Sequence, residues 1–169
     1  MRSGADWNLE PDSSAMQTVL GHFATGIILV TAIDDGEPVG MACNSFTSVS
    51  LDPPLVLVCA EKTSNTHPVI ADGGVFAVNL LRRGQEELSD RFASKKDEER
   101  RFVDLDYRVG ETGSPLIAGT LASLDCRVRA AHDAGDHVIY VGEVVDAQLD
   151  GGEPLLHYAR AYHRLAEPE

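Results

Sequence analysis

The chain has 169 residues, of which 43% are hydrophobic and 24% are charged, a composition typical of one globular domain and not of disordered, collagen-like or membrane proteins. Its 27 acidic residues outnumber 14 Lys and Arg residues, which gives a formal charge of −13. This charge excludes nucleic acid and anionic membranes as general partners, because phosphate groups attract basic surfaces. An anionic ligand would have to be held by a few local groups.

The N-terminal stretch MRSGADWNLEPDSS has no apolar segment and so does not resemble a signal peptide. We expect residues 1–12 to form a flexible extension of a single domain, 1–169. Cys43, Cys59 and Cys126 are odd in number and form no Cys-x-x-Cys pair, which favours packing thiols in a reducing compartment over disulfides or a zinc site. The sequence therefore predicts a cytoplasmic protein.

The first predicted element is a helix near the N-terminus. Ser13 or Ser14 is placed to cap it, and Gly26 is placed to end it. Between these positions apolar residues recur at helical spacing, as expected of an amphipathic helix: Met16, Val19, Leu20 and Phe23.

Strand signals follow this helix. The run GIILVTAI (26–33), a turn at 34–36 and a returning run at 38–43 predict a hairpin. Further strands are predicted at 47–50 and 55–59. Pro53 and Pro54 mark the point where pairing between them must break, because proline has no backbone N–H to donate.

The second half of the chain mixes helices and strands. A short helix is predicted after Lys62, capped by Ser64 or Thr66 and ended by Gly73 and Gly74. Further predictions are a strand at 75–81, one or two amphipathic helices within 84–102, a half-buried strand at 124–129 and a long strand at 137–149. Six to eight strands without regular βα alternation predict a mainly β fold, a small antiparallel barrel with peripheral helices.

No common catalytic motif is present in the sequence. It contains no G-x-G-x-x-G, no Walker loop, no G-x-S-x-G and no H-E-x-x-H. A metal site would need His132, Asp133, Asp136 and His137 to converge, yet these residues crowd one turn. Turn chemistry is the favoured interpretation, so no metal is predicted.

Three segments are candidates for ligand binding, each with an ordinary alternative. Lys62-Thr63-Ser64 precedes a helix, where backbone N–H groups, hydroxyls and a cation can bind phosphate, although a simple helix cap would look the same. The stretch from Gly40 to Ser50 is either a Thr/Ser ladder on a strand or a ligand-binding loop. His137 follows the turn Gly135-Asp136, whose geometry does not require a histidine, and a surface histidine is the alternative.

Together these segments resemble the flavin reductase-like family, whose members are reductase components of two-component flavin-dependent monooxygenases. The resemblance covers about residues 16–165, which we take as the domain core. Ala42 and Cys43 stand where many relatives have Thr and Ala, and His67 stands where close relatives often have Trp. The resemblance rests on ATGIILVT (24–31), GMACNSFTSVSLDPPLVLVC (40–59), KTSNT (62–66), FAVNLL (76–81), QEELSDRFA (85–93), RF (101–102), Cys126 and GDHVIYVGEV (135–144).

The resemblance implies an antiparallel split β-barrel of the FMN-binding type, Greek-key-like, that forms a homodimer. It implies transfer of hydride from NADH or NADPH to FMN or FAD, and supply of the reduced flavin to an oxygenase partner. His137 is the expected catalytic residue, near the nicotinamide side of the flavin. The cofactor-binding residues expected from the family are Met41, Ala42, Cys43, Asn44, Ser45, Cys59, Ala60, Lys62, Thr63, Ser64 and Thr66.

Two alternatives stay open at this point. A flavin-dependent oxygenase or flavin-storage protein could use the same barrel, because a fold does not determine an activity. A scaffold or regulatory domain without a ligand would leave the Lys62-Thr63-Ser64 and Gly135-Asp136-His137 segments without a role.

Overall fold

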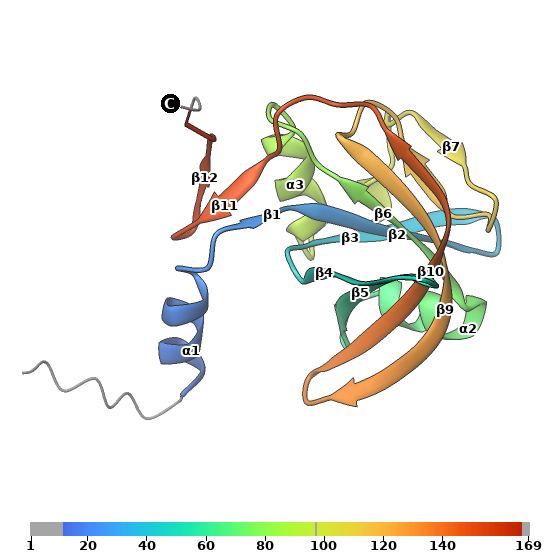
Figure 1. Ribbon diagram of the computed structural model, residues 1–169, viewed down its shortest axis with the longest axis horizontal. Coiled ribbons are helices and arrows are strands. Elements are labelled where there is room, and N and C mark those ends of the chain that lie inside the picture. Colours follow the sequence, from blue (N-terminus) through green and yellow to red (C-terminus); the bar gives the residue numbers. More distant parts are fainter. Residues whose placement is uncertain (1–11, 97, 167–169) are drawn as a thin grey trace, which may run out of the picture.

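The computed structural model describes residues 12–96 and 98–166, so the predicted N-terminal extension lies almost entirely outside the described residues. Its main element is a seven-stranded antiparallel sheet that curves around the core (Figure 1). Across the sheet the strands are β3 (Glu37–Cys43), β2 (Ile28–Asp34), β6 (Val75–Leu80), β9 (Ala122–Ala134), β10 (His137–Leu149), β5 (Pro54–Glu61) and β4 (Phe46–Leu51).

Two small sheets and three helices complete the described fold. The helices are α1 (Ser13–Leu20), α2 (Thr66–Gly73) and α3 (Glu86–Ala93), and a 3₁₀ turn spans Glu98–Arg100. The prediction of a mainly β fold with peripheral helices is confirmed. The short strands were not predicted, because two or three residues carry too little alternation to detect; they are β1 (Thr25–Gly26), β7 (Tyr107–Val109), β8 (Pro115–Ile117), β11 (Leu156–Tyr158) and β12 (Ala161–His163).

The core lies on both faces of β2. Ile28 and Val30 belong to a cluster that includes Ile70 of α2, whereas Leu29 belongs to a second cluster that includes Phe92 of α3. Successive side chains of a strand point to opposite faces, so a strand covered on both sides needs apolar residues at every position. This explains why the run from Ile27 to Val30 shows no alternation.

Helix α1 forms as predicted but with different ends. The Asp12 side chain caps it by accepting a 2.7 Å hydrogen bond from the Ala15 N–H, so the predicted Ser13 or Ser14 cap is wrong. The helix stops at Leu20, with Gly21 as its C-cap. Gly26 instead lies in β1. Gly21 closes the last turn by donating its N–H to the Gln17 carbonyl at 3.0 Å.

The C-terminal end of α2 agrees with the sequence, and the N-terminal end lies close to the prediction. The N-cap residue is Asn65, whose side chain makes no capping hydrogen bond. Of the two predicted caps, Ser64, one residue earlier, accepts a 3.2 Å hydrogen bond from the His67 N–H through its hydroxyl. At the other end Gly74 has φ = 66° and donates its N–H to the Ile70 carbonyl. A left-handed residue at this position is the usual reason for glycine at a helix C-terminus.

The strand predicted at 124–129 to be half-buried is part of β9, and it carries one buried carboxylate, that of Asp125. Arg127 and Arg129 lie on the polar side of the strand and form ion pairs with Glu111 and Glu143, but Asp125 is completely buried. Its carboxylate accepts hydrogen bonds from the N–H and the hydroxyl of Thr112, in the turn between β7 and β8. That turn covers the carboxylate and supplies the hydrogen bonds that a buried polar group requires.

None of the helices in residues 12–96 and 98–166 has the length and apolar character needed to cross a membrane.

Candidate functional site

A hollow of about 200 Å³ lies where the end of β3, the end of β5 and the start of α2 meet the C-terminal end of α3. It brings together most of the residues predicted as a ligand site from distant parts of the sequence. The predicted residues that line it are Met41, Ala42, Cys43, Asn44, Ser45, Cys59, Ser64 and His137.

The other four predicted residues do not line this hollow. Ala60 is fully buried in the core, because alternation along β5 turns its side chain away from the face that Cys59 and Glu61 present. Thr66 is also buried, and its hydroxyl donates to the Asn65 side chain. The Thr63 hydroxyl donates to the Glu61 carboxylate.

Lys62 is the fourth of these residues, and its ammonium group binds the β9–β10 hairpin. Lys62 Nζ lies 2.8 Å from each carboxylate oxygen of Asp133 and 2.7 Å from the Gly135 carbonyl oxygen. These contacts satisfy all three donors of an ammonium group. The position of Lys62 in the sequence, directly before a helix, contains no information about this partner.

The polar residues between Gly40 and Ser50 are satisfied in two ways. The Ser45 hydroxyl donates to the Cys59 carbonyl and accepts from the Cys59 N–H, both at 3.2 Å, and so fixes the β3–β4 corner to β5. Thr47 and Ser48 lie on β4 and are exposed. The stretch therefore combines a strand with solvated hydroxyls and a corner whose small side chains line the hollow.

The cysteines of the described chain are unpaired thiols. Burial raises the pKa of Cys43 to about 11, against the opposing effect of hydrogen bonds with Ser45. Burial, followed by the charge of Asp125, raises the pKa of Cys126 to about 12. Neutral thiols are poor nucleophiles, so Cys43 offers the hollow a small packing surface and not a reactive thiolate.

His137 stands at the edge of the hollow, at the start of β10. Its Nδ1 lies 2.7 Å from Asp136 Oδ1, and its side chain is 42% exposed. The hydrogen bond and the charge of His137 hold the pKa of Asp136 below its ordinary value. Because Nδ1 is engaged, Nε2 is the ring nitrogen left to meet a ligand.

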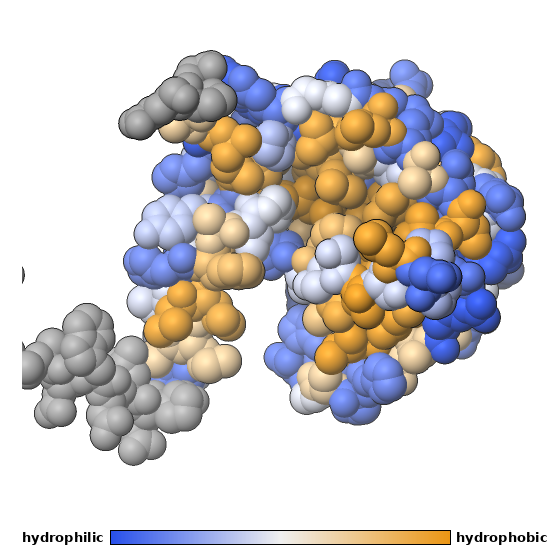
Figure 2. Space-filling model, viewed as in Figure 1, coloured by the Kyte–Doolittle hydropathy of each residue, from blue (hydrophilic) through white to orange (hydrophobic). Residues whose placement is uncertain are grey.

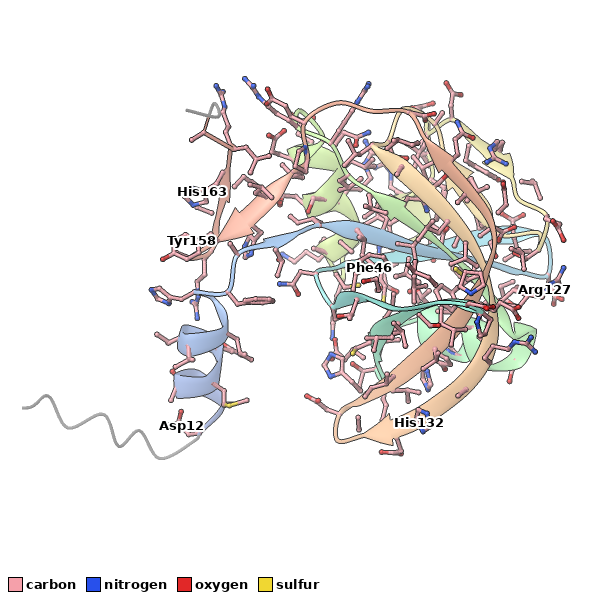
Figure 3. All side chains as sticks on the ribbon, in the orientation of Figure 1. Asp12, Phe46, Arg127, His132, Tyr158 and His163 are labelled. Atoms are coloured by element: carbon pink, nitrogen blue, oxygen red, sulfur yellow. The ribbon has the colours of Figure 1, made fainter. Side chains whose placement is uncertain are left out.

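The four residues weighed as a metal site take part in the hairpin. Asp133 binds Lys62 and Asp136 binds His137, while His132 lies on the long hairpin arm (Figure 3). In residues 12–96 and 98–166 no group of three or more His, Cys, Asp or Glu side chains is arranged to hold a metal ion.

The hollow has one side that sequence reasoning missed, formed by α3 and the segment after it. Together with Glu61 of β5, this side contributes a hydrophobic ring, two cations and two carboxylates. Its sequence signals were the QEELSDRFA and RF segments of the family resemblance, neither of which indicated a site residue. These residues are Glu61 of β5 together with Phe92, Ala93, Lys95, Glu98 and Arg101.

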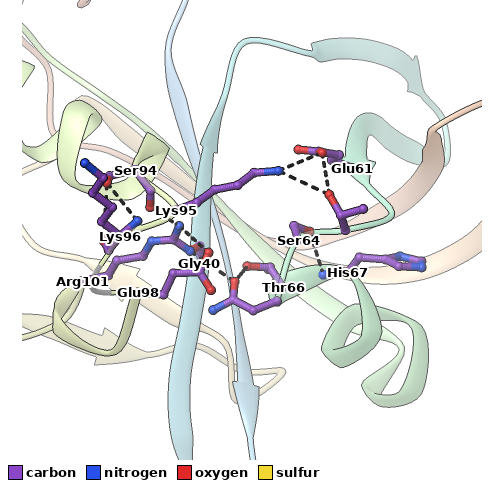
Figure 4. Close-up of polar contacts among 12 residues, drawn as sticks. Gly40, Glu61, Ser64, Thr66, His67, Ser94, Lys95, Lys96, Glu98 and Arg101 are labelled. Atoms are coloured by element: carbon purple, nitrogen blue, oxygen red, sulfur yellow. Dashed lines mark hydrogen bonds and ion pairs between the residues drawn. The ribbon is translucent and has the colours of Figure 1, made fainter.

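Arg101 connects this side of the hollow to the rest. It is 3% exposed. Nη1 donates to the Gly40 carbonyl at 2.8 Å and to Asn65 Oδ1 at 3.1 Å, and Nη2 donates to the Ser94 carbonyl at 2.6 Å and to Glu98 Oε1 at 3.0 Å (Figure 4). Its Nε is buried and has no hydrogen-bond partner in the described chain. One guanidinium thus holds β3, the start of α2 and the segment after α3 together.

A larger hollow of about 720 Å³ borders this one. It shares Gly40, Asn65 and Glu98 with the Arg101 network and is otherwise lined by Glu37, Pro38, Val39, Glu99 and Arg100. It contains none of the predicted site residues. The smaller hollow, with its small side chains, exposed backbone and neighbouring cations, suits a flat polar ring system that carries an anionic group.

Comparison with known proteins adds an independent line of evidence. Residues 20–166 match the profile of the flavin reductase like domain family. The chain is 45% identical over 155 residues to an FMN reductase (NADH) of Agrobacterium fabrum, covering 92% of this chain and 87% of that protein. It is 41% identical over 159 residues to the reductase subunit of a flavin-dependent monooxygenase of Rhodococcus jostii, covering 94% of this chain and 80% of that subunit.

A solved structure shares the fold. The NADH:FAD oxidoreductase of Streptomyces globisporus superimposes with a TM-score of 0.90 at 38% identity, covering 98% of this chain and 100% of that chain.

Proposed function

The chain belongs to the flavin reductase-like family, and from that premise we propose that it is an NADH-dependent flavin reductase that supplies reduced flavin to an oxygenase. The observation that carries the proposal is the convergence of the Met41–Ser45 corner, Cys59, Ser64 and His137 on one hollow. The curated relatives are named for NADH and for FMN or FAD. NADPH as an alternative hydride donor stays a prediction.

The residues present fit a bound flavin. Small side chains at Ala42, Cys43 and Ser45 let a flat ring approach the backbone, and the backbone offers donors and acceptors to the ring edge. The hollow of about 200 Å³ is smaller than the roughly 300–1,000 Å³ pockets that enclose drug-sized ligands. It would therefore hold part of the flavin, with the remainder outside it.

A bound flavin would supply the chemistry, because its ring system accepts hydride from a reduced nicotinamide. The protein then has to bind both molecules, set the stacking distance and exclude competing reactions. Asn44 and Ser45 line the hollow, and their backbone amides would favour a reduced ring held there by stabilising its negative charge. This division explains why the hollow contains no activated nucleophile.

The test of the proposed function follows the absorbance of NADH at 340 nm with the purified protein while FMN and then FAD are added. Oxidation of NADH that requires added flavin is the expected result. If flavin binds but NADH is not oxidised, the reductase proposal fails and a flavin-binding oxygenase or storage protein replaces it. NADPH in place of NADH determines the choice of hydride donor.

We propose that His137 positions the nicotinamide through Nε2. Replacing it by alanine is expected to lower kcat/KM for NADH by about tenfold and to change flavin affinity little. A tenfold change corresponds to the loss of one well-placed hydrogen bond. His132→Ala, on the same hairpin but outside the lining of the hollow, serves as the control. An unchanged kcat/KM for NADH in His137→Ala would remove this role.

We also propose a homodimer, supported by apolar surface on an arm made of α1, β11 and β12. Figure 2 shows apolar surface on this arm and on the neighbouring part of the main body. In α1 and just after it, Met16, Val19, Leu20 and Phe23 are 49%, 59%, 59% and 72% exposed. Monomers rarely expose so continuous an apolar patch.

A neighbouring hollow of about 310 Å³ supports the same dimer. It is apolar and is lined by Phe23, Phe46 and Leu121 among others, and Asn44 lines both this hollow and the candidate site. A second copy seated here would therefore reach the flavin site. Light scattering is expected to give twice the chain mass, and Phe23→Ser is expected to shift the protein toward monomer; a monomeric wild type contradicts the proposal.

Our proposal also includes the more detailed predictions made from the sequence. They are a single domain of the FMN-binding split-barrel type with Greek-key-like topology, a location in the cytoplasm and an oxygenase partner. The free thiols support a reducing compartment. A reductase subunit from Rhodococcus jostii at 41% identity supports the oxygenase partner. Ala60, Lys62, Thr63 and Thr66 stay sequence predictions for flavin contacts. Because the Lys62 ammonium group binds the β9–β10 hairpin, a flavin contact of Lys62 would come from its backbone.

A further inference from the structure

We propose that Lys95, and not Lys62, supplies the positive charge that selects flavins with a phosphate group. The inference rests on the proposed function, because it concerns the same flavin site. It names a residue that the sequence did not indicate and reassigns the role that the position of Lys62 suggested. Figure 4 shows Lys95 with Glu61 and Arg101, the groups around the proposed phosphate position.

The ammonium group of Lys62 is already bound to the β9–β10 hairpin. Its three contacts, with both Asp133 carboxylate oxygens and the Gly135 carbonyl, hold the β9–β10 hairpin against the end of β5. The Lys62 N–H adds a 3.0 Å hydrogen bond to the Asp136 carbonyl in the same hairpin. To bind a phosphate in the hollow, the ammonium would have to leave three partners at once.

Lys95 lines the hollow, and its ammonium group makes fewer contacts than that of Lys62. Its Nζ lies 2.9 Å from Glu61 Oε1 and 3.3 Å from the Thr63 hydroxyl, and its side chain is 64% exposed. Ser64, which also lines the hollow, stands at the start of α2. A phosphate between Ser64 and Lys95 would meet a hydroxyl and an ammonium group, two groups that commonly bind it.

The backbone beside Lys95 is anchored, although its side chain is exposed. Arg101 Nη2 donates to the Ser94 carbonyl at 2.6 Å, and the same guanidinium holds the Gly40 carbonyl and Asn65. The Lys95 side chain therefore starts from a point that is tied to β3 and to the start of α2. An anchored starting point reduces the conformational entropy lost when a long side chain binds a ligand.

Glu61 makes the inference testable in two directions. Its carboxylate accepts from the Thr63 hydroxyl and from Lys95. It therefore competes with a phosphate for Lys95 and also repels the phosphate. Removing the Lys95 charge should weaken the preference for a phosphorylated flavin, and removing the Glu61 charge should strengthen it.

The experiment compares FMN with riboflavin, which differ only in the phosphate. Dissociation constants for both are measured by quenching of flavin fluorescence, and the riboflavin-to-FMN ratio of the constants is reported. Because both ligands meet the same preparation, the ratio cancels any loss of folded protein. Lys95→Met is expected to lower the ratio by about tenfold, as the loss of one charge-assisted hydrogen bond at an exposed side chain predicts.

Three further variants complete the design. Glu61→Gln is expected to raise the ratio by about threefold, the size of an exposed charge interaction. Lys62→Met and Lys96→Met are expected to leave it unchanged. Lys96 is the matched control, since it is the next residue in the chain and lines a different hollow.

The results that contradict the Lys95 inference differ from the result that contradicts the proposed function. A ratio that is unchanged in Lys95→Met, or that falls in Lys62→Met or in Glu61→Gln, overturns the inference while the flavin reductase proposal survives. A wild-type protein that binds neither FMN nor riboflavin overturns the proposed function itself.

Discussion

Replacing Arg101 by methionine is expected to lower the free energy of unfolding by about 3 kcal/mol, the cost of removing one partner from a buried charged network. Methionine retains much of the side-chain volume but donates no hydrogen bond. The Gly40 and Ser94 carbonyls, Asn65 and the half-buried Glu98 carboxylate would each lose a donor. Urea unfolding followed by far-UV circular dichroism measures the change.

Arg100→Met is the control for this variant. Arg100 is adjacent in the chain, carries the same charge and is exposed, so its replacement should change the free energy of unfolding by less than about 0.5 kcal/mol, as is usual for surface substitutions. If the two variants lower the free energy of unfolding equally, the hydrogen bonds of Arg101 contribute nothing to stability beyond the effect of removing one positive charge.

Gly142→Ala is expected to destabilise the protein by about 2 kcal/mol through overpacking of the core. Gly142 is a buried position of β10, where an added Cβ would lie 2.5 Å from Phe76 Cζ, 2.8 Å from Phe76 Cε1 and 3.0 Å from Cys126 Cβ. Phe76 and Cys126 are themselves fully buried, so they have little room to move. Thermal unfolding and urea unfolding both measure the effect.

Two variants control for this interpretation. Gly26→Ala adds a Cβ that meets no atom within 4 Å and should change stability little. Phe76→Leu in the Gly142→Ala background removes the ring atoms that clash, so the double variant should be more stable than the sum of the single effects predicts. Strict additivity would show that Phe76 is not the obstacle.

Much of the fold could be predicted because it depends on local patterns. The change from helical to strand periodicity near residue 26 marked the start of the sheet, and Gly74 marked the end of α2 through its left-handed conformation. The family resemblance implied that the corner from Met41 to Ser45 binds flavin, whereas its small and polar residues alone left a strand and a ligand-binding loop as alternatives. The comparisons support the family that these motifs indicated.

The sequence by itself thus determined the class of fold, the main strands and most of the residues that line the site. The tertiary structure alone decided which long or polar side chains meet there. Alternation along β5 separates Ala60 from Cys59, but only the hairpin that packs beside β5 gives Lys62 its partners.

The burial of Arg101 and Asp125 was also decided by the tertiary structure alone. A charged residue is normally predicted to lie at the surface, because burying a charge without partners is costly. Here the partners come from segments 61 and 13 positions away, Gly40 for Arg101 and Thr112 for Asp125. Local periodicity contains no information about contacts at that separation, so burial of these two side chains could be established only from the folded chain.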